Sequence, residues 1–76
     1  MSADPVASGA VTIVANGAPR AVPAGATIAT FLAELGWKPA WVVVEHNGEP
    51  LARDRFGAVP LREGDRLEVV RAVAGG

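Results

Sequence analysis

The 76-residue sequence contains no cysteine, and it has no apolar run long enough to cross a membrane. Without cysteine, disulfide bonds, thiolate metal sites and covalent catalysis by a thiol of this chain are excluded. Seven basic and eight acidic residues are mixed along the chain and give a net charge of −1, so the sequence lacks the clustered basic face that binds DNA or RNA. We therefore expect neither nucleic acid nor a membrane among its partners.

The N-terminal run MSADP carries an acid where a secretion signal has lysine or arginine, and no apolar segment follows it. A cytoplasmic protein is expected. The length predicts one domain, and a hydrophobic content of 50% is enough for one small core. Residues 1–10 are small and polar and are expected to form a disordered tail, followed by a domain over 11–73 and a flexible reactive tail over 74–76.

Local signals predict a hairpin and then a helix. A β-branched run over 11–15 predicts a strand, and Asn16-Gly17 predicts a tight turn into a second strand over 20–22. Thr27 is expected to cap a helix that ends at Gly36. The apolar stripe of this helix, spaced at i, i+3, i+4 and i+7, consists of Ile28, Phe31, Leu32 and Leu35.

The second half of the chain predicts further strands over 41–46 and 66–73. Between them lie an Asn47-Gly48 turn, an edge segment at 50–51 and an irregular or 3₁₀ piece at 53–56. The order β-β-α-β-β predicts an α+β fold, in which one mixed sheet of four to five strands has a helix packed across one face.

Alternation along the strands assigns side chains to the two faces of this sheet. The face under the helix is expected to contain Val11, Ile13, Ala15, Val42, Val44, Leu67 and Val69, with Leu51, Phe56 and Leu61 closing the ends. The opposite face is expected to carry Val14, Val43 and Val70 beside Glu45, Arg66 and Glu68. These three valines are either scattered surface residues or a docking patch for a partner protein.

The remaining polar residues give no catalytic pattern. His46, the only histidine, is expected to be half-buried with its hydrogen bonds satisfied. The acids Asp54, Glu63 and Asp65 are interpreted as solvated turn residues, with Asp65 bonding nearby backbone N–H groups. Arg71 either lies over the sheet or meets an acidic partner surface. We find no phosphate-binding loop, nucleophile elbow or catalytic carboxylate pair, and expect no metal site.

The C-terminal residues are the strongest functional signal. The sequence passes from the last predicted strand through Arg71-Ala72-Val73-Ala74 to Gly75-Gly76. Together with the opening strand and Asn16-Gly17, the segments VEHNGE (44–49), LAR (51–53) and LREGDRLEVV (61–70) make the sequence resemble the ThiS-type sulfur carriers of thiamin biosynthesis, which have the ubiquitin-like β-grasp fold. The ten-residue N-terminal extension, and Ala74 where many members have glycine, are departures from that pattern.

This resemblance implies a carrier protein, not an enzyme, that works through the Gly76 carboxylate. A ThiF-like adenylating enzyme would use ATP and magnesium to form an acyl-adenylate, and this chain itself would bind no cofactor. Sulfur from a donor such as a cysteine desulfurase would replace AMP, and the resulting thiocarboxylate would serve thiazole synthase. Gly75 and Gly76 are small enough to enter a narrow active site. Partner contacts are expected from Val14, Val43 and Val70 and from the tail residues Arg71, Ala72, Val73 and Ala74.

Three alternatives remain open. The small subunit of molybdopterin synthase has the same fold and Gly-Gly end, although it often has a proline just before the terminus, which is absent here. A ubiquitin-like modifier also begins with adenylation, and Lys38 is the one lysine available for self-linkage. A plain interaction module would dock through the three outward valines and would not use its tail chemically.

Overall fold

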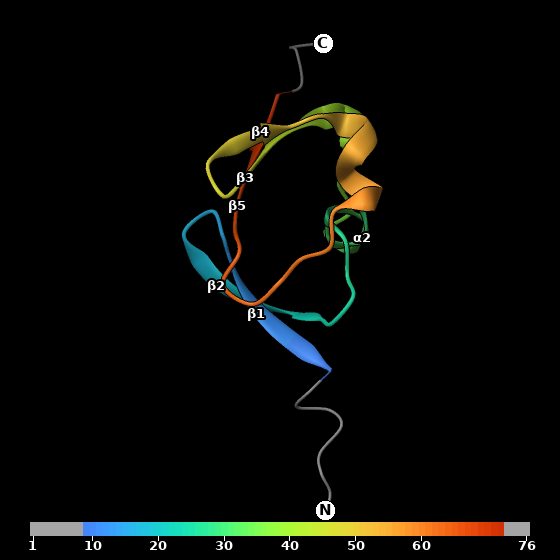
Figure 1. Cartoon of the computed structure of the whole chain (residues 1–76). Helices are drawn as coiled ribbons and strands as arrows, with labels where there is room; N and C mark the ends of the chain where they lie inside the picture. Colours follow the sequence, from blue (N-terminus) through green and yellow to red (C-terminus); the bar gives the residue numbers. More distant parts are fainter. Residues whose placement is uncertain (1–8, 73–76) are drawn as a thin grey trace, which may run out of the picture.

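The computed structural model describes residues 9–72, which form one five-stranded sheet with a short helix on one side (Figure 1). The strands are β1 (Ala10–Ala15), β2 (Ala18–Pro23), β3 (Val42–His46), β4 (Glu49–Leu51) and β5 (Arg66–Arg71). The helix α2 spans Ile28–Glu34, and two 3₁₀ turns, η1 (Pro39–Trp41) and η2 (Arg53–Ala58), complete the fold. The sheet order is β2-β1-β5-β3-β4, with β1 parallel to β5 and the other neighbours antiparallel. The predicted α+β fold is confirmed.

Both Asn-Gly pairs form the tight turns that the sequence predicts. Asn16 and Gly17 have φ values of 51° and 83°, and Asn47 and Gly48 have values of 52° and 86°. Two successive residues with positive φ match the right-handed twist of the flanking strands, and asparagine and glycine reach that region most easily. The two turns connect β1 to β2 and β3 to β4, which makes β2 and β4 the edges of the sheet.

The helix begins and ends at the predicted residues. Thr27 accepts a hydrogen bond from the Thr30 N–H through Oγ1 at 3.2 Å, and its own N–H donates to Thr30 Oγ1 at 2.9 Å, which closes a capping box. Gly36 (φ 77°) then ends the helix, and the N–H of Trp37 donates to the Leu32 carbonyl at 3.0 Å. This Schellman arrangement turns the chain back over the last turn of α2.

The core lies between α2 and the sheet, and the predicted faces are confirmed. Its buried residues are Ile13, Val22, Ile28, Phe31, Leu32, Val42, Val44, Phe56, Leu61, Leu67 and Val69. Val22 was not predicted to be buried, whereas Val11, Ala15 and Leu51 are only partly buried. Val22 reaches the core because β2 pairs with β1 over its full length, which places it opposite Val11.

Several predicted boundaries differ from the structure. The strand β2 spans Ala18–Pro23 instead of 20–22, because it pairs with β1 along its whole length. Trp41 ends the 3₁₀ turn η1 instead of starting β3, because Pro39 favours a turn and the N–H of Trp41 donates to the Lys38 carbonyl at 2.9 Å. The strand β1 begins at Ala10, and the Gly9 carbonyl accepts a hydrogen bond from the Ala24 N–H at 2.8 Å, so residues 9 and 10 belong to the fold. The strand β5 ends at residue 71, and residue 73 lies outside the described range. Over residues 9–72, no helix is long and apolar enough to span a membrane.

Candidate functional site

The face of the sheet that points away from α2 carries two adjacent exposed valines. Val43 and Val70 are direct cross-strand partners in β3 and β5, and they are 50% and 58% exposed. Val14 is half-buried and pairs with Arg66, four residues before Val70 and about 13 Å away along β5. The predicted outward orientation is confirmed, but the structure does not bring Val14 next to the other two valines.

Two glutamates lie next to this valine pair on the same face. Glu45 of β3 and Glu68 of β5 are exposed and directly opposite each other. Like charges in this position repel, and neither carboxylate has a cation within 4 Å among residues 9–72. The outward face therefore combines an apolar pair with two unneutralised negative charges.

The point where β5 ends is built from residues distant in sequence. The Ala72 N–H donates to the Trp41 carbonyl at 2.8 Å, which joins the end of the sheet to η1. Arg71 pairs with Val42, so it lies on the helix side and not beside the outward valines. Its guanidinium carbon is 5.6 Å from the ring centroid of Trp37 and 6.0 Å from that of Trp41. The structure shows the Arg71 side chain packed over two indole rings, and its contact with an acidic partner surface stays a prediction.

The predicted reactive residues Gly75 and Gly76, together with Val73 and Ala74, lie outside the described residues. The structure describes the chain as far as Ala72, whose backbone contact with Trp41 is the last one before them. Their roles in activation and partner binding therefore stay predictions.

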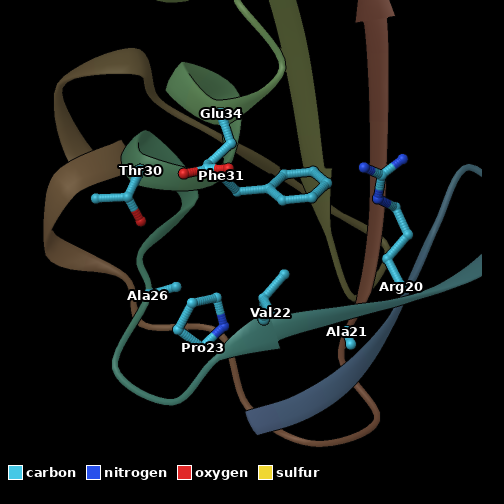
Figure 2. Close-up of a pocket in the computed structure, with 8 residues that line it drawn as sticks. All are labelled: Arg20, Ala21, Val22, Pro23, Ala26, Thr30, Phe31 and Glu34. Carbon is cyan, nitrogen blue, oxygen red and sulfur yellow. The ribbon is translucent and has the colours of Figure 1, made fainter.

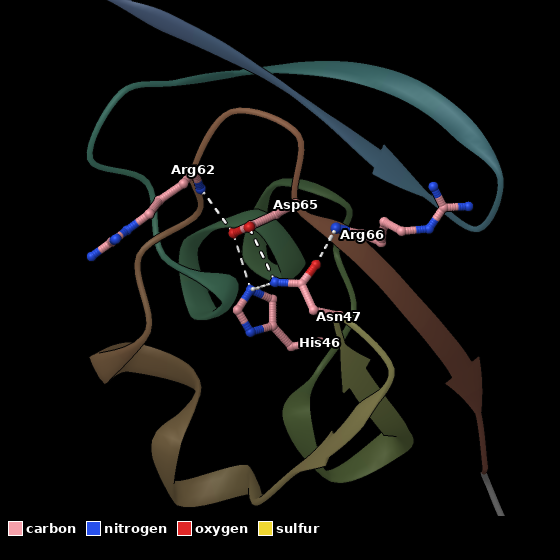
Figure 3. A network of polar contacts seen from close by, with 5 residues as sticks. All are labelled: His46, Asn47, Arg62, Asp65 and Arg66. Carbon is pink, nitrogen blue, oxygen red and sulfur yellow. Dashed lines mark hydrogen bonds and ion pairs between the residues drawn. The ribbon is translucent and has the colours of Figure 1, made fainter.

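At the other end of β5, His46 and Asp65 are joined by a hydrogen bond, with Nε2 and Oδ2 3.0 Å apart (Figure 3). Oδ2 also accepts the Arg62 N–H at 2.9 Å, and Oδ1 accepts from Asn47 Nδ2 at 3.2 Å. The ionised carboxylate has no hydrogen to donate, so the hydrogen lies on His46 Nε2. The 3.4 Å contact between that nitrogen and Asn47 Nδ2 is then a contact between two donors. The prediction of a satisfied His46 is confirmed.

The interpretation of Asp65 as a solvated turn acid is wrong in one respect, because its side chain is only 13% exposed. Partial burial on its own raises the pKa of this carboxyl. The hydrogen bonds from His46, the Arg62 N–H and Asn47, together with the charge of His46, outweigh burial and hold the pKa of Asp65 below its ordinary value. The carboxylate bonds the backbone as predicted, but it also connects the loop before β5 to the end of β3.

The side chains of the two turn asparagines are hydrogen-bonded to β5, a contact that local sequence does not predict. Asn16 Oδ1 accepts the Val69 N–H at 2.7 Å, and its Nδ2 donates to the Val69 carbonyl at 3.1 Å. Asn47 Oδ1 accepts the Arg66 N–H at 2.8 Å. These contacts replace strand-to-strand hydrogen bonds where β1 and β3 end. Local sequence shows why asparagine suits the turn, but not which strand lies beside it.

A hollow between β2 and α2 is a second surface feature that the sequence did not indicate (Figure 2). Arg20 and Phe31 face each other across it, with the guanidinium carbon 5.6 Å from the ring centroid. The hollow is lined by Arg20, Ala21, Val22, Pro23, Ala26, Thr30, Phe31 and Glu34. Over residues 9–72 there is no group of three histidine, aspartate or glutamate side chains that could hold a metal ion.

The strand order, the parallel β1–β5 pair and the helix across one face define a ubiquitin-like β-grasp protein. Residues 12–76 match the ThiS family, and the chain belongs to that family. The family expected from the sequence is therefore confirmed.

Two solved structures from Geobacter metallireducens are similar to this chain. The crystal structure of the thiamine biosynthesis protein ThiS has a TM-score of 0.73 and 30% sequence identity, over 87% of this chain and 100% of that one. An NMR structure of a thiamine biosynthesis protein has a TM-score of 0.70 at 30% identity, over 87% of this chain and 88% of the other.

Two curated relatives are named thiazole synthase. That of Magnetococcus marinus is 43% identical over 61 residues, which are 80% of this chain and 19% of the relative. That of Paramagnetospirillum magneticum is 36% identical over 64 residues, which are 84% of this chain and 20% of the relative. The chain thus spans about a fifth of the length of each of these relatives.

Proposed function

We propose that this protein is a sulfur carrier in thiamin biosynthesis that works through the C-terminal carboxylate of Gly76. A ThiF-like enzyme adenylates this carboxylate with ATP and magnesium and releases pyrophosphate. A persulfide sulfur then attacks the acyl carbon and AMP leaves, and a thiol reduces the remaining sulfur–sulfur bond to free the thiocarboxylate. Thiazole synthase takes up the sulfur. In this scheme the chain is a co-substrate, and the chemistry on ATP takes place on its partner.

The observation that carries this proposal is the family match, which runs from residue 12 through the Gly75-Gly76 pair. Adenylation makes a resonance-stabilised carboxylate electrophilic by giving it a good leaving group. Two glycines suit this step because no side chain obstructs the acyl carbon and because the backbone can adopt conformations closed to other residues. The β-grasp domain supplies a folded surface by which an enzyme can recognise the carrier.

The choice of thiazole synthase as the acceptor is supported by the relatives. In two proteins named thiazole synthase, a segment similar to this chain makes up about a fifth of the polypeptide. Joining a carrier to its acceptor in one chain raises the effective concentration of one for the other. We infer that this carrier serves the same acceptor, in preference to molybdopterin synthase.

The outward pair Val43 and Val70 is the proposed docking face for these enzymes. Exposed apolar side chains that are adjacent offer buried area to a partner, whereas single ones are ordinary on a surface. Val14 lies on the same face but away from the Val43–Val70 pair. In the sequence, Ala72, Val73 and Ala74 lie between β5 and the reacting group. Recognition of the domain is thus separated from chemistry at the C-terminus.

Intact mass spectrometry tests this proposal. The chain is co-expressed with a ThiF-like adenylating enzyme and a cysteine desulfurase, beside a variant that lacks Gly76. We expect the full chain to gain the mass of one oxygen replaced by sulfur and the shortened chain to gain nothing. Isopeptide-linked products instead of this mass change would favour a ubiquitin-like modifier, and an unchanged mass in both chains would favour an interaction module.

A further inference from the structure

Two aromatic and two cationic side chains surround the point where the chain leaves β5. Besides the Arg71 stack over Trp37 and Trp41, the Lys38 Nζ atom lies 5.4 Å from the Trp41 ring centroid. We refer to Trp37, Lys38, Trp41 and Arg71 as the collar. Both cations are exposed and both indoles are half-buried, so the charges face solvent on an aromatic support.

Backbone hydrogen bonds hold the collar in place. The Schellman motif at the end of α2 fixes the backbone of Trp37, and the 3₁₀ turn η1 fixes that of Trp41. Arg53 donates from Nε to the Pro39 carbonyl at 2.8 Å, which ties η1 to η2. The Ala72 N–H bond to Trp41 then joins β5 to this assembly. Three separate parts of the chain therefore meet where β5 ends: the end of α2 with the adjoining turn η1, the turn η2, and β5 itself.

The positive charges of the collar are not neutralised within the described part of the chain. Over residues 9–72, the one carboxylate within 4 Å of a basic side chain is Asp65, whose partner His46 lies at the opposite end of β5. Within residues 9–72, Lys38 and Arg71 therefore contact indole rings and no acidic side chain. Cations stacked on aromatic rings keep their charge while losing part of their rotational freedom, which lowers the entropic cost of binding an anionic group.

The length of the C-terminal segment places a partner against this collar. Four residues follow Ala72, and a fully extended chain spans at most about 3.6 Å per residue, so Gly76 reaches no further than about 14 Å from the end of the described fold. An enzyme that encloses the Gly76 carboxylate must bring the rim of its active site to the collar. We propose that the collar docks against acidic side chains at the opening of the enzyme site that receives the C-terminus. This inference rests on the proposed function and adds a second contact surface, on the helix side of the sheet.

Charge reversal at the collar tests the proposal kinetically. Pyrophosphate release from ATP by a ThiF-like adenylating enzyme is measured as a function of carrier concentration. We expect Lys38→Glu and Arg71→Glu each to raise KM for the carrier about tenfold with little change in kcat, and Arg71→Lys to preserve KM. The matched control is Arg62→Glu, the same charge change at an exposed position in the loop before β5. KM of the wild type should rise with salt, and this dependence should weaken in the reversed variants.

Fluorine NMR provides a readout of contact that does not depend on turnover. The chain has two tryptophans, and both belong to the collar, so 5-fluorotryptophan labelling gives two signals and each comes from a collar residue. We expect both signals to shift or broaden when the adenylating enzyme is added, and to remain unchanged when the carrier alone is concentrated. Signals that shift on concentration alone would indicate a second copy of the chain on the collar and would overturn the proposal.

A failure of the proposed function and a failure of the collar proposal give different experimental results. If the wild-type carrier supports no pyrophosphate release, the proposed function fails and the collar proposal fails with it. If the wild type reacts but Lys38→Glu has the wild-type KM, or bound enzyme leaves both fluorine signals unmoved, the collar proposal alone is wrong. Lys38→Glu is the decisive variant because Lys38 lies in no helix or strand and its one described side-chain contact is with Trp41. A thermal melt of each variant verifies that the fold is retained.

Discussion

Val43 of β3 and Val70 of β5 lie directly opposite each other on the face of the sheet that points away from α2, and both are half or more exposed. Val44, the next residue along β3, points the other way and is fully buried. Two chemically identical neighbours thus have opposite environments, because successive side chains of a strand alternate between faces.

This alternation predicts that substitution by aspartate affects stability differently at Val43 and at Val44. Val43→Asp is expected to change the free energy of unfolding by less than about 1 kcal/mol, since it alters mainly strand propensity at an exposed position. It should nevertheless raise KM in the pyrophosphate assay severalfold, because a charge replaces apolar contact area on the proposed docking face. Urea denaturation and the kinetic assay measure the two effects separately.

The matched control is Val44→Asp, which places a carboxylate in the core and is expected to unfold the domain or to cost at least about 3 kcal/mol. If Val43→Asp melted in the same way, the proposed docking surface would be wrong. If both stability and KM stayed unchanged, the Val43–Val70 pair would be ordinary surface.

The facing glutamates give a prediction of increased stability. Glu45→Lys replaces a like-charge cross-strand pair with an opposite-charge pair opposite Glu68, and we expect the domain to gain about 0.5 kcal/mol in urea denaturation at low salt. Adding Glu68→Lys restores a like-charge pair, so the double variant should lose that gain. A gain that survives in the double variant would mean that the two side chains do not interact.

Asn16 has two structural roles that a pair of substitutions separates. Asn16→Gly keeps the positive φ of the turn but removes both bonds to Val69, and we expect the free energy of unfolding to fall by about 1–3 kcal/mol because buried backbone groups lose their partners. Asn16→Asp keeps the acceptor for the Val69 N–H, so its free energy of unfolding should fall by less than that of Asn16→Gly. Equal stability of Asn16→Gly and the wild type would show that solvent replaces these bonds without cost.

Local sequence patterns predicted the features that depend on neighbouring residues. The Thr27 cap, the Gly36 stop, both Asn-Gly turns and the alternation of Val43 and Val44 each follow from the conformational preferences of a few adjacent residues. The family followed from the ordered set of segments ending in Gly-Gly.

The features that were missed depend on contacts between distant parts of the chain. Asn16 bonds Val69 across 53 positions, and His46 meets Asp65 across 19. Arg71 stacks on tryptophans from two separate turns. Alternation gives the face on which each of these residues lies, but it contains no information on strand order or register, so their partners become visible only once β5 is placed between β1 and β3.

The Asp65 network makes stability depend on pH in a defined direction. Because the folded-state pKa of Asp65 lies below its ordinary value of 3.8, the ionised form is the one that stabilises the fold. Its contribution is complete above that ordinary value and is lost as the pH falls through the lowered pKa. Asp65→Asn removes the charge at every pH, so we expect a loss of about 1–2 kcal/mol at neutral pH.

The difference in free energy of unfolding between the wild type and Asp65→Asn should therefore narrow as urea titrations are repeated from pH 7 towards pH 3. Asp54→Asn is the matched control, because Asp54 is exposed and the same chemical change there removes no described hydrogen bond. Its difference from the wild type should stay small at every pH. If the difference in free energy of unfolding between the wild type and Asp65→Asn stayed constant down to pH 3, the carboxylate charge would not contribute to stability. Its hydrogen bond to His46 would then not contribute either, and the side chain would act through packing alone.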